Sequence, residues 1–396
     1  MQKIKNYFHF AQSLSACLFY GFPAKKLTVI GVTGTDGKTT TSNLIYHLLK
    51  EEGYKVAVIS TIGAYVNGKL LDTGLHVTTP TGFALQKIIK TIQKEDCTHL
   101  VLEITSHALD QNRAFGIPID IGVITNITHE HLDYHKTFQR YQNTKLKLFK
   151  NARVSVLNAD DPSFDYFKRK LSDKKLVTYS TRLKNVDFNP EKAGLKGDDF
   201  NTSNQLAAIS VLSEITNGSY ASSIKSIETF QLPEGRQEYV FMDSFSVMVD
   251  FAHTPNSIEL ILAHLRPKVK GRIIHVFGSA GERDATKRPL MGAASSKYSD
   301  VIVLTSEDPR HEDAGEICED IARGIKSSFV RKDSLDNKSK NMYVIIPDRR
   351  DAIRQALNIA LEGDFVLVSG KGHEKSMNIM GIENPWSDKE TVLSFL

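Results

Sequence analysis

The chain has 396 residues, of which 41% are hydrophobic, and a formal net charge of +4. This length can supply the cores of two or three domains. The small positive excess suits a protein that handles anionic small molecules, and it lacks the concentrated basic patch of a nucleic-acid-binding protein. The three cysteines form no Cys-x-x-Cys pair, which argues against a disulfide framework or a zinc site and favours a reducing, cytoplasmic setting.

The N-terminal stretch 1–23 raises a question of targeting. It contains two early lysines and then a moderately apolar run, MQKIKNYFHFAQSLSACLFYGFP. This run is too short and too polar for a membrane-spanning helix. A signal peptide is one alternative. We expect a helix that packs on the following domain, with a helix at a membrane interface as the second interpretation.

From residue 27 onward, apolar β-branched runs alternate with helix-like stretches. The runs are KLTVIGVTG, YKVAVIST, THLVLEIT, IDIGVITNI and VSVLNAD, and helices are predicted over 38–50, 82–94 and 136–150. Such alternation is typical of βαβ units and predicts a largely parallel sheet. The turn sequence VNGK at 66–69 predicts a β-hairpin beside that sheet.

The pattern starts again after QLPEGRQEY, residues 231–239. The runs FSVMVDFA, GRIIHVFGSA, SDVIVLTSE, NMYVIIPD and DFVLVSG are again separated by helical stretches. The sequence therefore predicts an α/β protein with a central domain over 24–232 and a second, Rossmann-like α/β domain over 233–396.

A candidate phosphate-binding loop lies at the end of the first run, GVTGTDGKTT at 31–40. The common Walker A pattern needs a glycine where this chain has Val32. A glycine-rich link between a strand and a helix still presents backbone N–H groups to phosphate oxygens. Lys38 would then reach the terminal phosphates, and the Thr39 hydroxyl would help to hold Mg²⁺. The alternative is an ordinary strand–helix turn with an exposed lysine.

Two polar clusters follow later strands of the predicted sheet. Glu103 ends one run and precedes the sequence TSHALDQNR, and Asn126 ends another and precedes ITHEHLDYH. Ligands of open α/β sheets bind at the carboxyl ends of the strands, so we expect both clusters beside the phosphate loop. A carboxylate and an imidazole there would suit a second magnesium ion, although each histidine alone is more typical of a structural role.

Nine segments occur in the order seen in the Mur ligases, which the chain resembles over residues 24–396. They are GTDGKTT, TTPT, EITSHALDQNR, NITHEHLDYH, YQNTKLKLF, VDFAHTPNSI, GERDATKRPLMG, EDPRHED and GKGHE. Within that family the chain is most similar to the UDP-N-acetylmuramoyl-tripeptide synthetases, which add the third amino acid of the peptidoglycan stem. These ligases carry a GTxGK(S/T) loop, so the loop resembles a phosphate binder of a separate subclass.

The resemblance implies an ATP-dependent ligase that makes an acyl phosphate and then an amide. It implies that Lys38 contacts the phosphates, that Thr39 and Glu103 bind one Mg²⁺, that His131 binds a second, and that Lys145 is carbamylated. On its residues alone, Lys145 would be a surface lysine. The resemblance assigns nucleotide binding to Gly34, Thr35, Asp36, Gly37, Lys38, Thr39, Thr40, Asn126, Asn204, Arg236, Asp250, His253 and Glu282. Glu282 stands where these ligases usually have aspartate.

The resemblance also indicates which amino acid is added. Family members that add meso-diaminopimelate carry DNPR, whose arginine binds the distal carboxylate. Here the sequence is EDPR, so Arg310 is present and Asp308 replaces asparagine, which favours diaminopimelate and adds a negative charge. The residues implied to bind the two substrates are Thr78, Thr79, Ser106, Arg113, Arg288, Asp308, Arg310, Gly370 and Glu374.

The chain departs from the family pattern at its start. Family members begin with a domain that binds the UDP part of the acceptor, and we expect the helical segment 1–23 to stand in its place. The leading hypothesis is a monomeric muramoyl-peptide ligase, with a partner protein as one source of the UDP anchor. The alternatives are a related ligase with another acceptor, as in cyanophycin or polyglutamate synthesis, and a non-catalytic nucleotide-binding protein.

Overall fold

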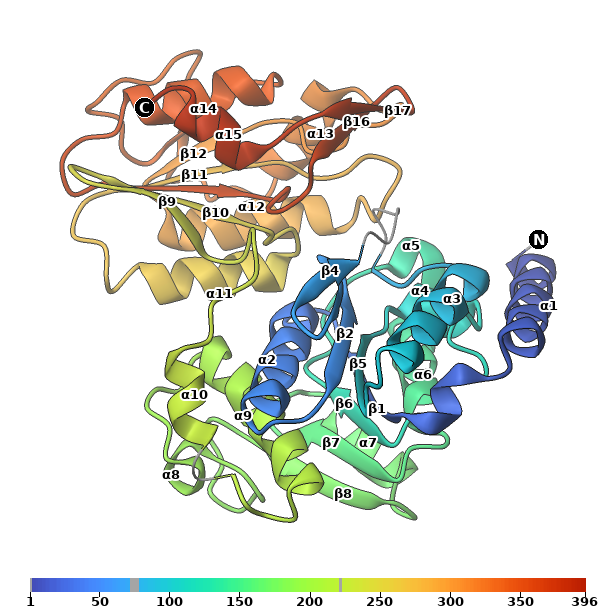
Figure 1. Ribbon diagram of the computed structural model, residues 1–396. Coiled ribbons are helices and arrows are strands. Elements are labelled where there is room, and N and C mark those ends of the chain that lie inside the picture. The colour runs from blue at the N-terminus through green and yellow to red at the C-terminus, as the bar shows by residue number, and fades with distance from the viewer. Residues whose placement is uncertain (1, 72–77, 221–222) are drawn as a thin grey trace. The chain divides into compact units, whose positions relative to one another are not determined.

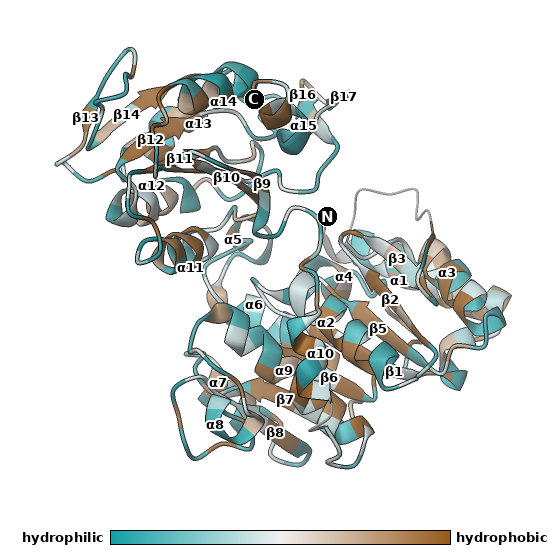
Figure 2. Cartoon of the chain, turned by 60° about the vertical axis from the view of Figure 1, so that its left-hand side comes forward, coloured by the Kyte–Doolittle hydropathy of each residue, from teal (hydrophilic) through white to brown (hydrophobic). Residues whose placement is uncertain are grey.

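The computed structural model describes residues 2–71, 78–220 and 223–396 (Figure 1). The chain divides into two compact units. The first contains Met1–Thr128 and Thr137–Pro233, and the second contains His129–Lys136 and Glu234–Leu396. Each unit is built on a mostly parallel sheet, and Figure 2 shows that the strands are predominantly hydrophobic. Among the described residues, no helix is both long enough and apolar enough to cross a membrane.

Eight strands form the sheet of the first unit, in the order β4-β3-β2-β5-β1-β6-β7-β8. The strands from β2 to β8 in that order are parallel, and β3 and β4 extend the sheet antiparallel. The predicted hairpin is confirmed, because Asn67 and Gly68 join β3 to β4 with φ of 47° and 83°, as a type I′ turn requires. The strands are β1 (Thr28–Thr33), β2 (Val56–Ser60), β3 (Gly63–Val66), β4 (Lys69–Leu71), β5 (His99–Glu103), β6 (Ile121–Ile124), β7 (Val154–Asn158) and β8 (Lys175–Tyr179).

Helices cover both faces of this sheet, over two separate apolar cores. Leu85, Ile89 and Ile92 of α3 belong to one core, and Leu44, Leu48 and Leu206 of α2 and α9 belong to the other. The helical elements are α1 (Gln2–Tyr20), η1 (Pro23–Lys26), α2 (Lys38–Glu51), α3 (Gly82–Lys94), α4 (Ser106–Asp110), α6 (Phe138–Leu146), η2 (Lys147–Phe149), α7 (Phe164–Lys170), α8 (Pro190–Ala193), α9 (Phe200–Ile215) and α10 (Ile224–Glu228).

The second unit contains a seven-stranded sheet in the order β13-β14-β12-β11-β15-β10-β9, which is parallel except at β9. The five predicted runs form β10, β11, β12, β14 and β15, whereas the short strands β9, β13, β16 and β17 were not predicted. The strands are β9 (Glu238–Met242), β10 (Ser246–Asp250), β11 (Ile273–Phe277), β12 (Val301–Leu304), β13 (Val330–Arg331), β14 (Met342–Ile345), β15 (Phe365–Ser369), β16 (Ser376–Ile379) and β17 (Ile382–Pro385).

The helices of the second unit follow its strands, apart from α5, which comes from the inserted segment His129–Lys136. Thr254 caps α11 in a capping box with Ser257, and aspartates cap α13 and α14. These helices are α5 (Leu132–His135), α11 (Pro255–Leu265), α12 (Lys287–Tyr298), α13 (Ala314–Ala322), α14 (Arg349–Asn358) and α15 (Asp388–Leu393).

A fully buried ion pair joins two loops at the carboxyl ends of the second sheet. Arg349 makes a bidentate contact with Asp388, at 2.8 Å from Nε and 2.7 Å from Nη2. The same guanidinium donates to the carbonyl oxygens of Ser306, which follows β12, and of Ser369, which ends β15. Because its donors are distributed among three partners, Arg349 fixes the loops that carry the EDPR and GKGHE sequences.

Glu307 lies in the same buried region as Arg349. Its Oε2 atom has no hydrogen-bond partner among the described residues. Burial raises the pKa of Glu307 from 4.5 to about 7, although the cations Lys287, Arg349 and Lys371 act in the opposite direction. The folded protein therefore retains a proton on Glu307 that the unfolded chain releases above its ordinary pKa.

This retained proton predicts a pH dependence of stability. With a folded-state pKa near 7, the stabilisation is complete below about pH 4.5 and is lost as the pH rises through 7. As the pH rises from 4.5 through 7, we expect the free energy of unfolding of the wild-type protein to fall by up to about 3 kcal/mol relative to that of Glu307→Gln. Urea unfolding of both proteins at several pH values measures the difference. Glu362→Gln, at an exposed site, is the control, and parallel pH profiles for wild type and Glu307→Gln would contradict the prediction.

Candidate active site

The predicted phosphate loop joins β1 to α2 and requires glycine at two positions. A Cβ built on Gly34 would lie 1.8 Å from the Thr125 hydroxyl oxygen. Gly37 caps α2 with φ of 78°, and a Cβ there would lie 2.5 Å from Asn204 Oδ1. The loop therefore packs against the residues after β6 and against α9 more closely than any side chain at these positions would permit.

The backbone of the loop is held by the residues that follow β6. The Thr35 amide donates to the Asn126 carbonyl at 2.8 Å, and the Asp36 amide donates to Asn126 Oδ1 at 2.9 Å. The Thr125 hydroxyl donates to the Asp36 carbonyl at 2.6 Å. Asn126, predicted to contact the nucleotide, thus supports the loop itself, and Asn204 accepts a hydrogen bond from the Thr41 hydroxyl at 3.2 Å.

The N-terminal end of α2 provides the anion-binding groups. Lys38, Thr39 and Thr40 form its first turn, whose backbone N–H groups have no partner within the helix. Lys38 Nζ donates to the Thr35 carbonyl at 2.7 Å, so the ammonium folds back over the loop. A helix N-terminus with a lysine at this position is suited to phosphate.

A buried carboxylate lies beside this helix terminus, at the end of β5. Glu103 is 1% exposed, and its Oε1 accepts hydrogen bonds from the hydroxyls of Thr39 at 3.2 Å and Thr61 at 3.0 Å. The Thr61 amide donates to Glu103 Oε2 at 3.0 Å. Thr61 was missed in the sequence analysis, although its place directly after β2 (Val56–Ser60) indicates the same sheet edge.

The residues predicted to bind the acceptor gather next to Glu103. Thr78 Oγ1 lies 2.9 Å from Thr61 Oγ1, and Thr79 Oγ1 donates to the Glu103 carbonyl at 3.2 Å. Arg113 Nη1 donates to the Thr79 carbonyl at 2.9 Å. Ser106 is buried at the start of α4, directly after β5. His76 and Val77 of the same motif lie outside the described residues.

Lys145 lies in α6 and is 1% exposed, so the interpretation as a surface lysine is wrong. Its Nζ donates to the Gly34 carbonyl at 2.6 Å and lies 4.5 Å from the centre of the Tyr141 ring. The Tyr141 hydroxyl is 3.1 Å from Thr35 Oγ1. Lys145 and Tyr141 therefore hold the phosphate loop through its Gly34 carbonyl and its Thr35 hydroxyl.

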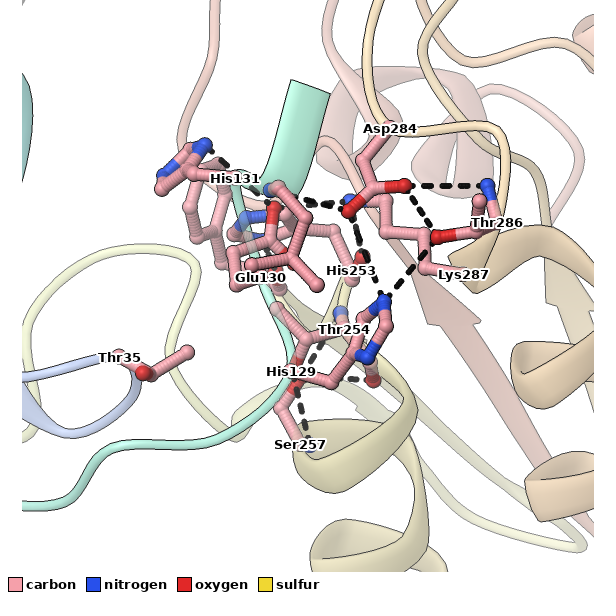
Figure 3. Close-up of polar contacts among 12 residues, drawn as sticks. Thr35, His129, Glu130, His131, His253, Thr254, Ser257, Asp284, Thr286 and Lys287 are labelled. Carbon is pink, nitrogen blue, oxygen red and sulfur yellow. Dashed lines mark hydrogen bonds and ion pairs between the residues drawn. The ribbon is translucent and has the colours of Figure 1, made fainter. Parts of the chain in front are cut away.

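The segment that contains His131 packs within the second unit (Figure 3). Lys287 Nζ, buried at the start of α12, lies 3.2 Å from Glu130 Oε1 and donates to the His253 carbonyl at 2.9 Å. Asp284 Oδ2 accepts from the Leu132 amide at 3.1 Å. These contacts hold the backbone on both sides of His131.

His131 itself adopts the left-handed conformation and is partly exposed. It has φ of 57° at the N-cap of α5, and its Nδ1 lies 3.8 Å from Glu130 Oε1. The neighbouring His129 contacts Thr286 at 3.1 Å and Asp284 at 3.6 Å. The sequence analysis did not identify Lys287 or Asp284, because the contacts with 129–132 are distant in sequence.

The nucleotide residues predicted near β10 form a small cluster. Asp250 ends the strand and accepts the amides of Gln237 and Ala252, both at 2.7 Å. The Arg236 guanidinium lies 4.2 Å from the centre of the Phe251 ring, and His253 Nδ1 lies 2.8 Å from the Phe251 carbonyl oxygen. Asp250 thus fixes the backbone at Gln237 and Ala252, and the Arg236 guanidinium packs on the Phe251 ring.

The loops after β12 and β15 bring charged groups together. Lys371, 1% exposed, lies 2.7 Å from Asp308 and 2.5 Å from Glu374. Burial acts to lower the pKa of Lys371, but the carboxylates of Glu374 and Asp308 hold it above its usual value. Gly370 has φ of 111°, and a Cβ there would lie 2.7 Å from Glu307 Oε2. Asp308 also accepts the Asn378 amide at 2.9 Å.

Arginines lie on the other side of the EDPR loop. Arg310 has φ of 55°, and its amide donates to the Asn378 carbonyl at 3.0 Å. Burial, and then the charge of Arg310, lower the pKa of Arg283, while the carboxylates of Asp133, Glu130 and Asp308 act in the opposite direction. Arg283 was not predicted, although it lies within the GERDATKR motif. Arg288 pairs with Glu312 at 2.8 Å and with Asp320 at 3.0 Å, which gives this buried cation an internal role.

Glu282 is placed away from the residues near β10. It adopts a left-handed conformation, and its carboxylate lies 2.9 Å from His311 Nδ1. Its side chain is 48% exposed. Among the described residues, no group of three or more His, Cys, Asp or Glu side chains is arranged to hold a metal ion.

Family models match both units of the chain. Residues 32–226 match the Mur ligase middle domain, and residues 235–372 match the Mur ligase, glutamate ligase domain. The chain is 38% identical to a UDP-N-acetylmuramoyl-L-alanyl-D-glutamate–2,6-diaminopimelate ligase of Aquifex aeolicus, over 96% of this chain and 80% of the relative. It is 37% identical to a UDP-N-acetylmuramyl-tripeptide synthetase of Borrelia garinii, over 95% of this chain and 77% of the relative.

Solved structures agree with these sequence relationships. A structure of a UDP-N-acetylmuramoyl-L-alanyl-D-glutamate–2,6-diaminopimelate ligase is 30% identical with a TM-score of 0.59, covering 93% of this chain and 78% of that one. A folylpolyglutamate synthase of Mycobacterium tuberculosis, at 14% identity and a TM-score of 0.70 over 91% of this chain and 92% of that one, shares the fold. The phosphate loop, the chain length covered and the identities lead to one conclusion: this chain is a ligase that belongs to the Mur ligase family.

Proposed function

We propose that this enzyme uses ATP to join the carboxylate of a muramoyl-dipeptide-type acceptor to the amine of meso-diaminopimelate, in peptidoglycan synthesis. The observation that carries the proposal is the phosphate loop of 34–37 with three side chains around it. Lys38 contacts the Thr35 carbonyl, the buried Glu103 contacts Thr39, and the buried Lys145 contacts the Gly34 carbonyl. The relatives named as diaminopimelate ligases support the choice of substrates. The acceptor carboxylate attacks the γ-phosphate, and the amine then displaces phosphate from the acyl phosphate.

The residues around the loop fit a magnesium–nucleotide complex. Glu103 and Thr39 present oxygens 3.2 Å apart at the N-terminus of α2, and hard divalent cations prefer such ligands. Bound Mg²⁺ would supply charge neutralisation on the phosphates. Thr39 and Glu103 would hold one ion, and His131 is the proposed ligand of a second. Lys38 and the amides of α2 bind and orient the phosphates, while Asn126 keeps the loop rigid.

Lys145 is suited to carbamylation by its burial and its hydrogen bond. A neutral lysine amine adds to CO₂ and releases a proton, which converts a cation into an anionic oxygen donor. The modified nitrogen keeps one N–H, so it can still donate to the Gly34 carbonyl that Nζ contacts at 2.6 Å. The change would remove the penalty of a buried ammonium and add carboxylate-like oxygens under the phosphate loop.

The charges after β12 are consistent with diaminopimelate. The extra negative charge of Asp308 is paired with Lys371 at 2.7 Å, so it does not oppose a substrate carboxylate without compensation. We propose that Arg310, with Arg283, receives the distal carboxylate, and that Glu374 faces a substrate ammonium. The positively charged side chain of lysine would meet two guanidinium groups there and would be disfavoured.

Mass spectrometry of reaction products tests the proposed function. The enzyme would be incubated with ATP, UDP-MurNAc-dipeptide or MurNAc-dipeptide, and a panel of amino acids. We expect the mass of a dipeptide acceptor extended by diaminopimelate, together with release of phosphate. Product formed only with a glutamate-chain acceptor would indicate the polyglutamate-like alternative, and absence of phosphate release with every acceptor would overturn the enzymatic assignment.

Replacement of Lys38 tests the phosphate loop. Lys38→Ala removes the cation at the helix terminus, and we expect kcat to fall by about 10²–10³-fold or more. Lys50→Ala, at the other end of α2 and exposed, is the matched control with normal turnover. A folded Lys38→Ala protein with near-normal phosphate release would show that the loop has another role.

Replacement of Lys145 tests the carbamate. We expect Lys145→Ala to be inactive and to regain part of its activity with added short carboxylic acids, whereas exposed Lys150→Ala stays active. A carbamate carbon signal in NMR spectra of wild type under ¹³C-labelled CO₂, absent from Lys145→Ala, gives a readout besides activity. Full activity of Lys145→Ala without rescue, or an unchanged carbon signal, would reject the modification.

Replacement of Arg310 tests amino-acid selection. Loss of a guanidinium from a bound carboxylate costs on the order of 2–5 kcal/mol, so Arg310→Ala should sharply lower kcat/KM for diaminopimelate. The ratio of kcat/KM for diaminopimelate to that for lysine should fall as well. Arg354→Ala, a half-exposed arginine of α14 paired with Asp351, controls for loss of surface charge. Wild-type preference for lysine would contradict this assignment.

A further inference from the structure

The outward face of α1 carries large apolar side chains that the first unit does not cover. Tyr7, Phe8, Leu18 and Phe19 are 75%, 67%, 66% and 76% exposed. The opposite face is buried and packs against α3, through residues such as Ser13, Ala16 and Cys17. The expected packing of this helix on the following domain is confirmed, and its placement at a membrane interface stays a prediction.

The spacing of these side chains makes one continuous strip. Phe8 and Phe19 lie on the same face as Ala11 and Ser15, which are exposed and small. The strip therefore has aromatic residues at both ends and no charged group between them. An exposed apolar strip of this kind on a folded protein marks a surface that contacts something other than water.

Helix α1 and the neighbouring elements η1 and α3 are basic and contain no acidic residue. Among residues whose side chains the structure describes, these three elements contain six lysines, and neither aspartate nor glutamate occurs within their bounds; the lysines are Lys5, Lys25, Lys26, Lys87, Lys90 and Lys94. The chain as a whole is nearly balanced, with 50 basic and 46 acidic residues. The acidic residues Glu95 and Asp96 follow α3, and Asp110, which contacts Asn6, is paired with Lys147.

We propose that the strip of α1 and the surrounding lysines dock the enzyme reversibly on an anionic lipid surface. Aromatic and leucine side chains on one face of a helix, with lysines at its margins, are the composition of helices that lie in the headgroup region. The helix is not apolar enough to span the bilayer, so it would lie along the surface. A second copy of this chain is a poorer occupant, because a symmetric contact would place lysines against lysines.

Vesicle co-sedimentation of the full chain tests this proposal. We expect binding to vesicles of phosphatidylcholine with phosphatidylglycerol, little binding to phosphatidylcholine alone, and loss of binding as salt increases. Phe8→Ser with Phe19→Ser should weaken partitioning about tenfold or more, because both apolar side chains are lost. Lys25→Gln with Lys26→Gln should weaken it by roughly fivefold per charge. Met242→Ser with Val330→Ser removes exposed apolar side chains elsewhere and should change nothing.

Three results would overturn the proposal. They are equal binding to neutral and anionic vesicles, unchanged binding of the variants without Phe8 and Phe19, and a dimer in light scattering that dissociates in those variants while vesicles are not bound. Thermal unfolding by circular dichroism checks each variant, and Phe19→Ser alone replaces the double variant if that one does not fold. Ligase activity in solution is expected to be unchanged in all of them, which separates this proposal from the proposed function.

Discussion

The parallel pairing of β1 with β5 and β6 is the constraint on which the candidate site depends. Val32 pairs with Glu103 and Thr33 pairs with Ile124, so the three strands end together. The phosphate loop, the Glu103 carboxylate and Asn126 must therefore meet at one edge of the sheet, whatever the rest of the chain does. Because Gly34 packs directly on Thr125, a slip of this register would drive the loop backbone into β6 or leave it unsupported.

Buried cations hold the loops at both sheets. Lys145 contacts the Gly34 carbonyl, Lys287 contacts Glu130 and the His253 carbonyl, Arg349 contacts Asp388 and two carbonyls, and Lys371 contacts Asp308 and Glu374. A buried charge is tolerated only when oxygens surround it, so each cation fixes the position of the loop that supplies them.

The sequence predicted the strands of both sheets well, because each is a short run of β-branched residues with turn residues at its ends. It did not predict β9, β13, β16 or β17, whose residues are mostly exposed or half-buried and so form no buried apolar run. The burial of Lys145 was also missed, since a helix with three lysines in YQNTKLKLFK gives no apolar stripe that marks one of them as internal. Thr61 ends a predicted apolar run and directly follows β2, and Arg283 lies within GERDATKR, so their positions were signals that could have found them. Lys287 acts through partners distant in sequence, and a single sequence contains no signal for such pairs.

The substitution at Asp308 shows why a local motif is insufficient for specificity. In the sequence alone, Asp308 places a negative charge two residues before Arg310, the proposed ligand of a substrate carboxylate. In the structure that charge belongs to a group of one cation and two carboxyl groups, Lys371 with Asp308 and Glu374. The charges of Arg310 and Asp308 both act on Arg283. Diaminopimelate carries an ammonium and a carboxylate at its distal end, whereas lysine carries only the ammonium there. In the proposed binding mode the distal carboxylate faces Arg310 and a substrate ammonium faces Glu374. In that binding mode the pairing of Asp308 with Lys371 leaves Arg310 available to the distal carboxylate, so the substitution is compatible with the proposed choice of diaminopimelate.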